Sequence, residues 1–161
     1  MPYWQLFYHI VWSTKNREPL LTPEAEPIIY GYLRNKALGL EANVYAINGY
    51  RDHVHLVASI PPKIAVSKFV GQVKAVASVK YNQSRPGAAP FYWQEEFGAF
   101  SFDRKRLPYV AAYVENQKTH HANNRLIPIL ERDDMDDTLR EAPALYTATD
   151  DRWRQEMLEM E

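Results

Sequence analysis

Cysteine is absent from this chain of 161 residues. Its absence excludes disulfide-stapled folds and metal sites built on thiolates, and it fits a reducing cytoplasm. No segment approaches the roughly 20 consecutive apolar residues that a membrane-spanning helix needs. The stretch from Met1 to Leu20 also has no basic segment followed by an apolar run, as a secretion signal would have. These absences predict a soluble, cytoplasmic protein.

The chain also has little net charge, since 19 Lys and Arg oppose 20 Asp and Glu. The charges are unevenly distributed. Residues 1–121 carry 14 basic and 9 acidic side chains, whereas residues 122–161 carry 5 basic and 11 acidic ones. A body of net charge +5 permits a polyanionic partner such as nucleic acid. The acidic tail is either a solvated extension, which we favour, or a segment that folds over the basic body as a DNA mimic.

Hydrophobic residues make up 46% of the sequence, enough for one compact domain with a real core. Periodicity and turn residues predict the element order β-α-β-β-α-β-α. The expected strands are 4–13, 42–50, 53–60 and one or two within 91–102, and the expected helices are 22–38, 64–82 and 106–121.

This order predicts an α+β fold of the ferredoxin-like, split β-α-β kind, with an antiparallel sheet and helices packed mainly on one face. The link between the second and third strands is too short for a parallel crossover, so these strands should form an antiparallel hairpin. We expect one domain over residues 1–128. Residues 129–161 form the acidic tail, in which 150–161 has a weak helical pattern.

The sharpest local feature is His53-Val54-His55. Side chains alternate along a strand, so both imidazoles point the same way, roughly 6.5–7 Å apart. That spacing allows both rings to converge on one divalent ion. A His-x-His pair alone is a weak signal, because two half-exposed polar residues on a solvated sheet face are the more common outcome.

A second feature is the segment Tyr113 to Gln117 in the last expected helix. Tyr113 and Gln117 are four residues apart, so they share one helix face. A tyrosine hydroxyl has a pKa of about 10, and it needs a Lewis acid or a base to attack at neutral pH. The amide oxygen of Gln117 is a plausible third ligand beside two imidazoles. Taken alone, a helical tyrosine is usually a packing residue.

Several ordered segments together resemble the HUH single-tyrosine transposases of small insertion sequences and their repeat-associated relatives. The resemblance covers about residues 3–121. It is carried by the opening strand at 8–15 (YHIVWSTK), by 52–56 (DHVHL), by the Gly-aromatic stretch at 93–102, and by the helix at 113–121 (YVENQKTHH).

The resemblance implies specific roles for these residues. His53, His55 and Gln117 would bind Mg²⁺ or Mn²⁺, and Tyr113 would attack a phosphate of single-stranded DNA with hairpin structure to give a 5′-phosphotyrosine link and a free 3′-hydroxyl. Members of the family often work as homodimers in which the tyrosine helix completes the partner's site, whereas the repeat-associated relatives can act as monomers. Either arrangement is open for this chain.

Other residues are weaker candidates. Asp52 is a candidate to orient a metal ligand, although a turn aspartate often bonds its own backbone. His120 and His121 end the tyrosine helix and are minor candidates for metal or DNA contact, because the helix dipole alone favours histidine there. His9 is interpreted as structural. Trp93 and Phe97 would either stack on bases or pack in the core. The basic residues favoured for phosphate contact are Lys15, Arg17, Arg104, Lys105 and Arg106, from a wider pool of Arg51, Lys63, Lys68, Lys74 and Lys80.

Two further functions remain open from the sequence. One is a catalytically idle protein that binds single-stranded nucleic acid and descends from such a transposase. The other is a metal-dependent hydrolase with water as nucleophile, which ranks last because only Asp52 lies near the histidine pair and such sites usually include carboxylate ligands.

Overall fold

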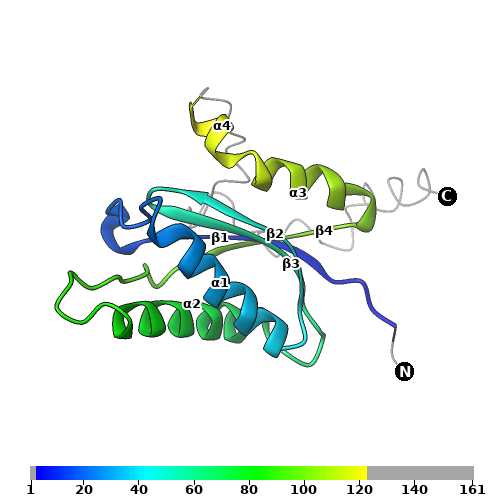
Figure 1. Cartoon of the computed structure of the whole chain (residues 1–161). Coiled ribbons are helices and arrows are strands. Elements are labelled where there is room, and N and C mark those ends of the chain that lie inside the picture. The colour runs from blue at the N-terminus through cyan, green and yellow to red at the C-terminus, as the bar shows by residue number, and fades with distance from the viewer. Residues whose placement is uncertain (1–2, 123–161) are drawn as a thin grey trace, which may run out of the picture.

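The computed structural model describes residues 3–122. The predicted acidic tail, 129–161, and its weakly helical end lie outside these residues. The strands form one four-stranded sheet. Figure 1 shows the long helices against one face of this sheet and a shorter helix across the other. No helix in the described part of the chain is long and apolar enough to cross a bilayer.

The strands confirm the predicted antiparallel sheet. They are β1 (Phe7–Ser13), β2 (Asn43–Tyr50), β3 (His53–Ser59) and β4 (Gly98–Phe102), in the spatial order β2-β3-β1-β4. Every neighbouring pair is antiparallel. Because β3 lies between β1 and β2, the first β-α-β unit is split as predicted. Residues Arg51 and Asp52 close the tight β2–β3 hairpin.

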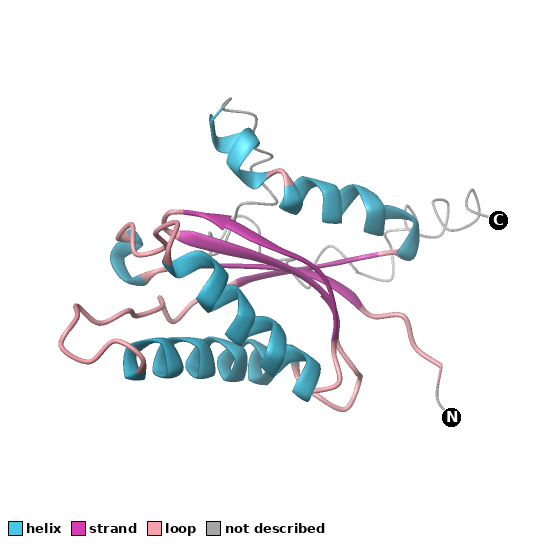
Figure 2. Cartoon of the chain, viewed as in Figure 1, coloured by secondary structure: helices cyan, strands magenta, loops and turns pink. Residues whose placement is uncertain are grey.

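The two long helices cover one face of the sheet (Figure 2). They are α1 (Ala25–Gly39) and α2 (Val66–Gln83), and they pack beside each other. Just before α1, the Thr22 hydroxyl accepts a hydrogen bond from the Ala25 amide at 3.2 Å, so Thr22 caps the start of this helix. Short 3₁₀ turns at Lys15–Arg17 and Arg104–Arg106 complete the connections.

The pleat of the sheet separates two kinds of side chain. On the side of α1 and α2, a large apolar core contains Ile10, Trp12, Val54 and Leu56, all fully buried. On the other side, α3 (Leu107–Glu115) packs over β2 and β3 with a small cluster that includes Val57 and Val110. The prediction that helices lie mainly on one face is confirmed, and α3 is the helix that covers the other face.

The prediction of one continuous last helix is wrong. It divides at Asn116, with φ −96° and ψ 19°, into α3 and α4 (Gln117–Ala122). The Asn48 side chain of β2 donates a hydrogen bond to the Glu115 carbonyl at 2.8 Å. This tertiary contact supplies a partner for a carbonyl at the helix end. Sequence periodicity carries no information about such a contact.

Candidate active site

The predicted histidine pair lies on the face of the sheet beneath α3 and α4. His53 is 4% exposed and His55 is fully buried, and their ring centroids are 5.1 Å apart. The intervening Val54 and the following Leu56 point into the apolar core, as predicted. The pair is therefore buried and does not lie on a solvated face of the sheet. Two buried imidazoles require polar partners.

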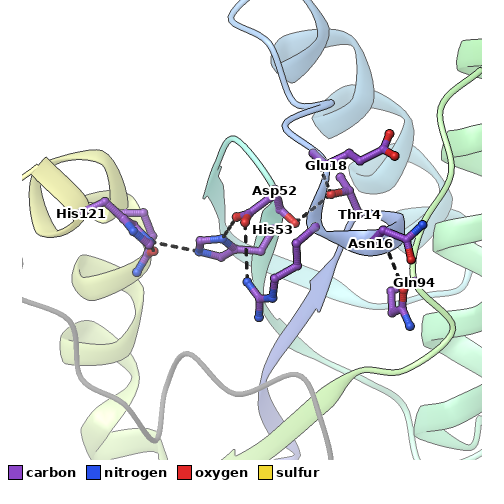
Figure 3. Close-up of polar contacts among 9 residues, drawn as sticks. Thr14, Asn16, Glu18, Asp52, His53, Gln94 and His121 are labelled. Carbon is purple, nitrogen blue, oxygen red and sulfur yellow. Dashed lines mark hydrogen bonds and ion pairs between the residues drawn. The ribbon is translucent and has the colours of Figure 1, made fainter. Parts of the chain in front are cut away.

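Asp52 is one such partner. Its Oδ1 lies 2.7 Å from Nδ1 of His53, and its Oδ2 lies 3.7 Å from a guanidinium nitrogen of Arg17 (Figure 3). Partial burial raises the pKa of the Asp52 carboxyl, but the hydrogen bond and charge of His53 and the charge of Arg17 outweigh burial and leave that pKa below its usual value. An ionised Asp52 accepts the Nδ1–H of His53, and this tautomer directs the lone pair of Nε2 away from the carboxylate.

His9 is the partner of His55. Nε2 of His9 lies 2.8 Å from Nδ1 of His55, and the two rings stack with centroids 5.1 Å apart. His9 is fully buried. It was interpreted as structural from the sequence, and the structure places it within the candidate site. Strand alternation predicts the face of the sheet on which His9 lies. Its contact with His55 depends on the register of β1 against β3.

Tyr113 joins the cluster from α3. Its ring packs edge-on against His55, with centroids 6.3 Å apart, and the side chain is 4% exposed. One chain is sufficient to bring this tyrosine to the histidine pair. A second tyrosine on the same helix, Tyr109, is 60% exposed and lies about one turn away.

Gln117 and His121 complete the cluster from α4. Gln117 is fully buried, and its Oε1 lies 3.1 Å from Nε2 of His121. The same His121 nitrogen lies 3.0 Å from Nε2 of His53 (Figure 3). The ring of His121 stacks on Tyr50, with centroids 4.5 Å apart and planes 6° apart. The sequence raised His121 only as a minor candidate, and it did not single out Tyr50.

The cluster has the donor types of a divalent-metal site. Its imidazole nitrogens suit transition-metal ions, and the amide oxygen of Gln117 suits harder ions as well. The contact between His53 and Asp52 is the carboxylate–histidine pairing that orients metal ligands in many sites. Within residues 3–122, no three His, Asp or Glu side chains form a metal site by themselves. A site with three or more ligands here therefore needs the amide oxygen of Gln117.

The basic residues proposed for DNA contact lie at two places. Lys15 and Arg17 are exposed in the turn after β1, next to Asp52, and the Lys15 ammonium lies 5.7 Å from the Tyr92 ring. Arg104, Lys105 and Arg106 are also exposed but precede α3. Tyr113 lies seven residues or more along the chain from them, about 10 Å along a helix axis. Only the first group lies beside the histidine cluster.

Three sequence interpretations are settled by packing. The prediction that Lys74 is available for phosphate contact is wrong. Lys74 is only 7% exposed, and its ammonium donates to the carbonyls of Gln94 and Glu95. Trp93 and Phe97 both pack against the main core, so core packing accounts for both. The Trp93 indole also donates to the Lys74 carbonyl at 3.0 Å.

Comparison with known families places this geometry in context. The family model described as "Transposase IS200 like" matches residues 2–117, which include the histidine pair, Tyr113 and Gln117. The chain belongs to the IS200-like transposase family. The resemblance inferred from sequence motifs is thereby confirmed.

Individual IS200-like relatives are similar over parts of the chain. The transposase for insertion sequence element IS200 from Salmonella typhimurium is 30% identical over 76 residues, and the same holds for that of Salmonella typhi. These matches cover 47% of this chain and 50% of each relative, so the aligned part spans half the length of those proteins. The ISDra2 transposase TnpA of Deinococcus radiodurans is 26% identical over 119 residues, covering 71% of this chain and 85% of that protein.

Two solved structures share the fold. A crystal structure of a Deinococcus radiodurans R1 protein has a TM-score of 0.57 at 22% identity, covering 73% of this chain and 95% of the other. A REP-associated tyrosine transposase bound to a REP hairpin has a TM-score of 0.56 at 15% identity, covering 84% of this chain and 94% of the other. At these sequence identities, the similarity to the two solved structures is evidence for a shared fold.

Proposed function

We propose that this chain is a transposase that cuts and rejoins single-stranded DNA through a covalent 5′-phosphotyrosine intermediate on Tyr113. The observation that carries the proposal is the contact between Tyr113 of α3 and His55 of β3. Tyr113 belongs to the small apolar cluster under α3, but its ring also meets a buried imidazole, which a packing tyrosine does not require. Membership of the IS200-like transposase family supports the same function.

The proposed reaction has two balanced steps. In the first, the Tyr113 hydroxyl oxygen attacks the phosphorus, an O–P bond to tyrosine forms, and the bond from phosphorus to the 3′-oxygen breaks. The proton lost by the phenol balances the one gained by the released 3′-hydroxyl. In the second, a different 3′-hydroxyl attacks the same phosphorus and releases the tyrosine. One phosphoester replaces another in each step, so no external energy source is required.

His53, His55 and Gln117 would hold Mg²⁺ or Mn²⁺, with Asp52 orienting His53. When bound, the ion supplies Lewis acidity at the phosphate and lowers the cost of negative charge there. The protein's own residues position Tyr113 and exclude water from it. Tyr113 is 4% exposed, so its side chain is shielded from bulk water.

The proposed DNA substrate is single-stranded and carries a hairpin. The relative solved with a REP hairpin supports a hairpin partner. Lys15 and Arg17 would contact phosphates next to the cluster, and Arg104, Lys105 and Arg106 would contact phosphates farther along the strand. A homodimer remains a prediction, although one chain is enough to bring Tyr113 to His55.

The test is adduct formation on single-stranded hairpin DNA taken from the sequence that flanks the gene. With Mg²⁺ or Mn²⁺, we expect a covalent protein–DNA species that survives denaturing electrophoresis. The change Tyr113→Phe should abolish the adduct and preserve DNA binding. Tyr109→Phe is the matched control, because it removes the same hydroxyl from an exposed position on the same helix. Binding without any adduct in the unchanged protein would instead identify an idle nucleic-acid-binding protein.

A further inference from the structure

His121 lies where a fourth metal-binding side chain would lie. Its Nε2 is 3.0 Å from Nε2 of His53 and 3.1 Å from Oε1 of Gln117. Two donors that bind one ion at about 2.1 Å, at right angles, are themselves about 3.0 Å apart. Both measured separations match that value.

The ring of His121 is held in this position by other parts of the fold. It stacks on Tyr50 with nearly parallel planes, and Tyr50 ends β2 beside the hairpin that carries His53. From the same helix, the Lys118 ammonium donates to Asn48 of β2 at 2.8 Å and pairs with Glu26 of α1 at 2.8 Å. These contacts fix α4 to the body of the protein.

The division of the last helix gives α4 its direction. Gln117 and His121 are four residues apart within α4, so they project from one face of it. Figure 3 shows His121 directed from α4 toward His53 at the hairpin. The Asp52 carboxylate binds the other nitrogen of His53, so that Nε2 of His53 faces the same space.

We propose that His121 becomes a metal ligand of this site when the ion binds, in addition to His53, His55 and Gln117, although the three imidazoles do not by themselves form a metal site in the described part of the chain. The inference rests on the proposed metal-assisted function. It adds an imidazole nitrogen to the donor set, and added imidazoles favour transition-metal ions over Mg²⁺, which prefers oxygen ligands. The site should therefore prefer Mn²⁺ to Mg²⁺, and His121 should be a source of that preference.

The experiment is titration of the full-length protein with Mn²⁺ alone, followed by electron paramagnetic resonance of the free ion, with no DNA present. His121→Ala should weaken Mn²⁺ binding by about 10- to 100-fold and should weaken Mg²⁺ binding, measured by competition, by less. Thr119→Ala is the matched control, because Thr119 is exposed on the same helix. It should leave both affinities unchanged.

A second variant separates ligand loss from misfolding. His121→Gln keeps a side chain that can donate an amide oxygen, so it should restore part of the Mn²⁺ affinity and reduce the preference for Mn²⁺ over Mg²⁺. Thermal melting without metal checks that each variant is folded.

Three results overturn the inference. Unchanged Mn²⁺ affinity in folded His121→Ala means that the ring is not a ligand, and the metal-assisted function still stands. Tighter binding in that variant means that the ring occupies the ion's own position. If the unchanged protein binds no Mn²⁺ at all, the metal-assisted function fails together with this inference.

Discussion

Both faces of the two central strands, β1 and β3, are largely buried, but they differ in chemistry. Toward α1 and α2, β1 and β3 present Ile10, Trp12 and Leu56, which are fully buried among apolar side chains. Toward α3 and α4, the same strands present His9 and His55, also fully buried. Burial at a strand position in this protein therefore identifies either the core or the candidate active site. The polarity of the buried side chain distinguishes the two.

The polar face is stable only because its members are partners for each other. An imidazole buried without a hydrogen bond costs about 1–3 kcal/mol. Here His9 meets His55, Asp52 meets His53, and Gln117 meets His121. The apolar face contributes most of the stability, whereas the polar face holds reactive groups in fixed positions. Substitutions on each face of the sheet test this division.

The largest expected effect on stability is on the apolar face. Leu56→Ala removes a fully buried side chain between α1, α2 and the sheet, and it should lower the free energy of unfolding by about 2–5 kcal/mol. Urea unfolding followed by circular dichroism measures this loss. The folded fraction should still form the DNA adduct, because the neighbouring His55 faces the other way. A loss below about 1 kcal/mol would show that this face is not the main source of stability.

A smaller effect is expected on the polar face. Asp52→Ala removes the carboxylate that orients His53, so Mn²⁺ affinity should fall by about 10- to 100-fold. Asp52→Asn retains an oxygen that accepts from Nδ1 of His53, so it should retain most of the affinity. Calorimetric titration with Mn²⁺ gives both values. Equal Mn²⁺ affinity in Asp52→Ala and in the unchanged protein would show that Asp52 has no part in metal binding.

The last comparison uses two glycines with opposite surroundings, and the expected effects have opposite signs. A β-carbon at Gly49 of β2 would lie 2.8 Å from the buried Tyr30 hydroxyl and would also meet the His53 carbonyl. Gly49→Ala should therefore lower the free energy of unfolding by about 1–3 kcal/mol. Gly71→Ala is the matched control in α2, with nothing within 4 Å, and it should raise stability by about 0.5–1 kcal/mol. Equal effects of the two changes would contradict the packing between β2 and α1.

Much of this division was predictable from local sequence. Alternation placed His53 and His55 on one face of β3 and Val54 and Leu56 on the other. Thr22 marked the start of α1, and the short link at Arg51-Asp52 required a hairpin. These features depend on residues close in sequence, where periodicity and capping have direct structural consequences.

The features that were not predicted depend on tertiary contacts. The place of His9 in the site follows from the register of β1 against β3, and the break at Asn116 accompanies a hydrogen bond from Asn48. Lys74 looked solvent-facing, but the loop after Phe91 returns to bind its ammonium. His121 gained its position from α4 and Tyr50 together. No local pattern in the sequence encodes these pairings.

The central claim is that Tyr113, on the buried polar face, is the group that attacks DNA. The most direct test is mass spectrometry of the trypsin-digested protein–DNA adduct, because one peptide, residues 107–118, contains both Tyr113 and the exposed Tyr109. Fragment ions assign the nucleotide to one of the two tyrosines. We predict that the phosphonucleotide is on Tyr113. A phosphonucleotide on Tyr109, or on any residue outside this peptide, would contradict the proposed active site.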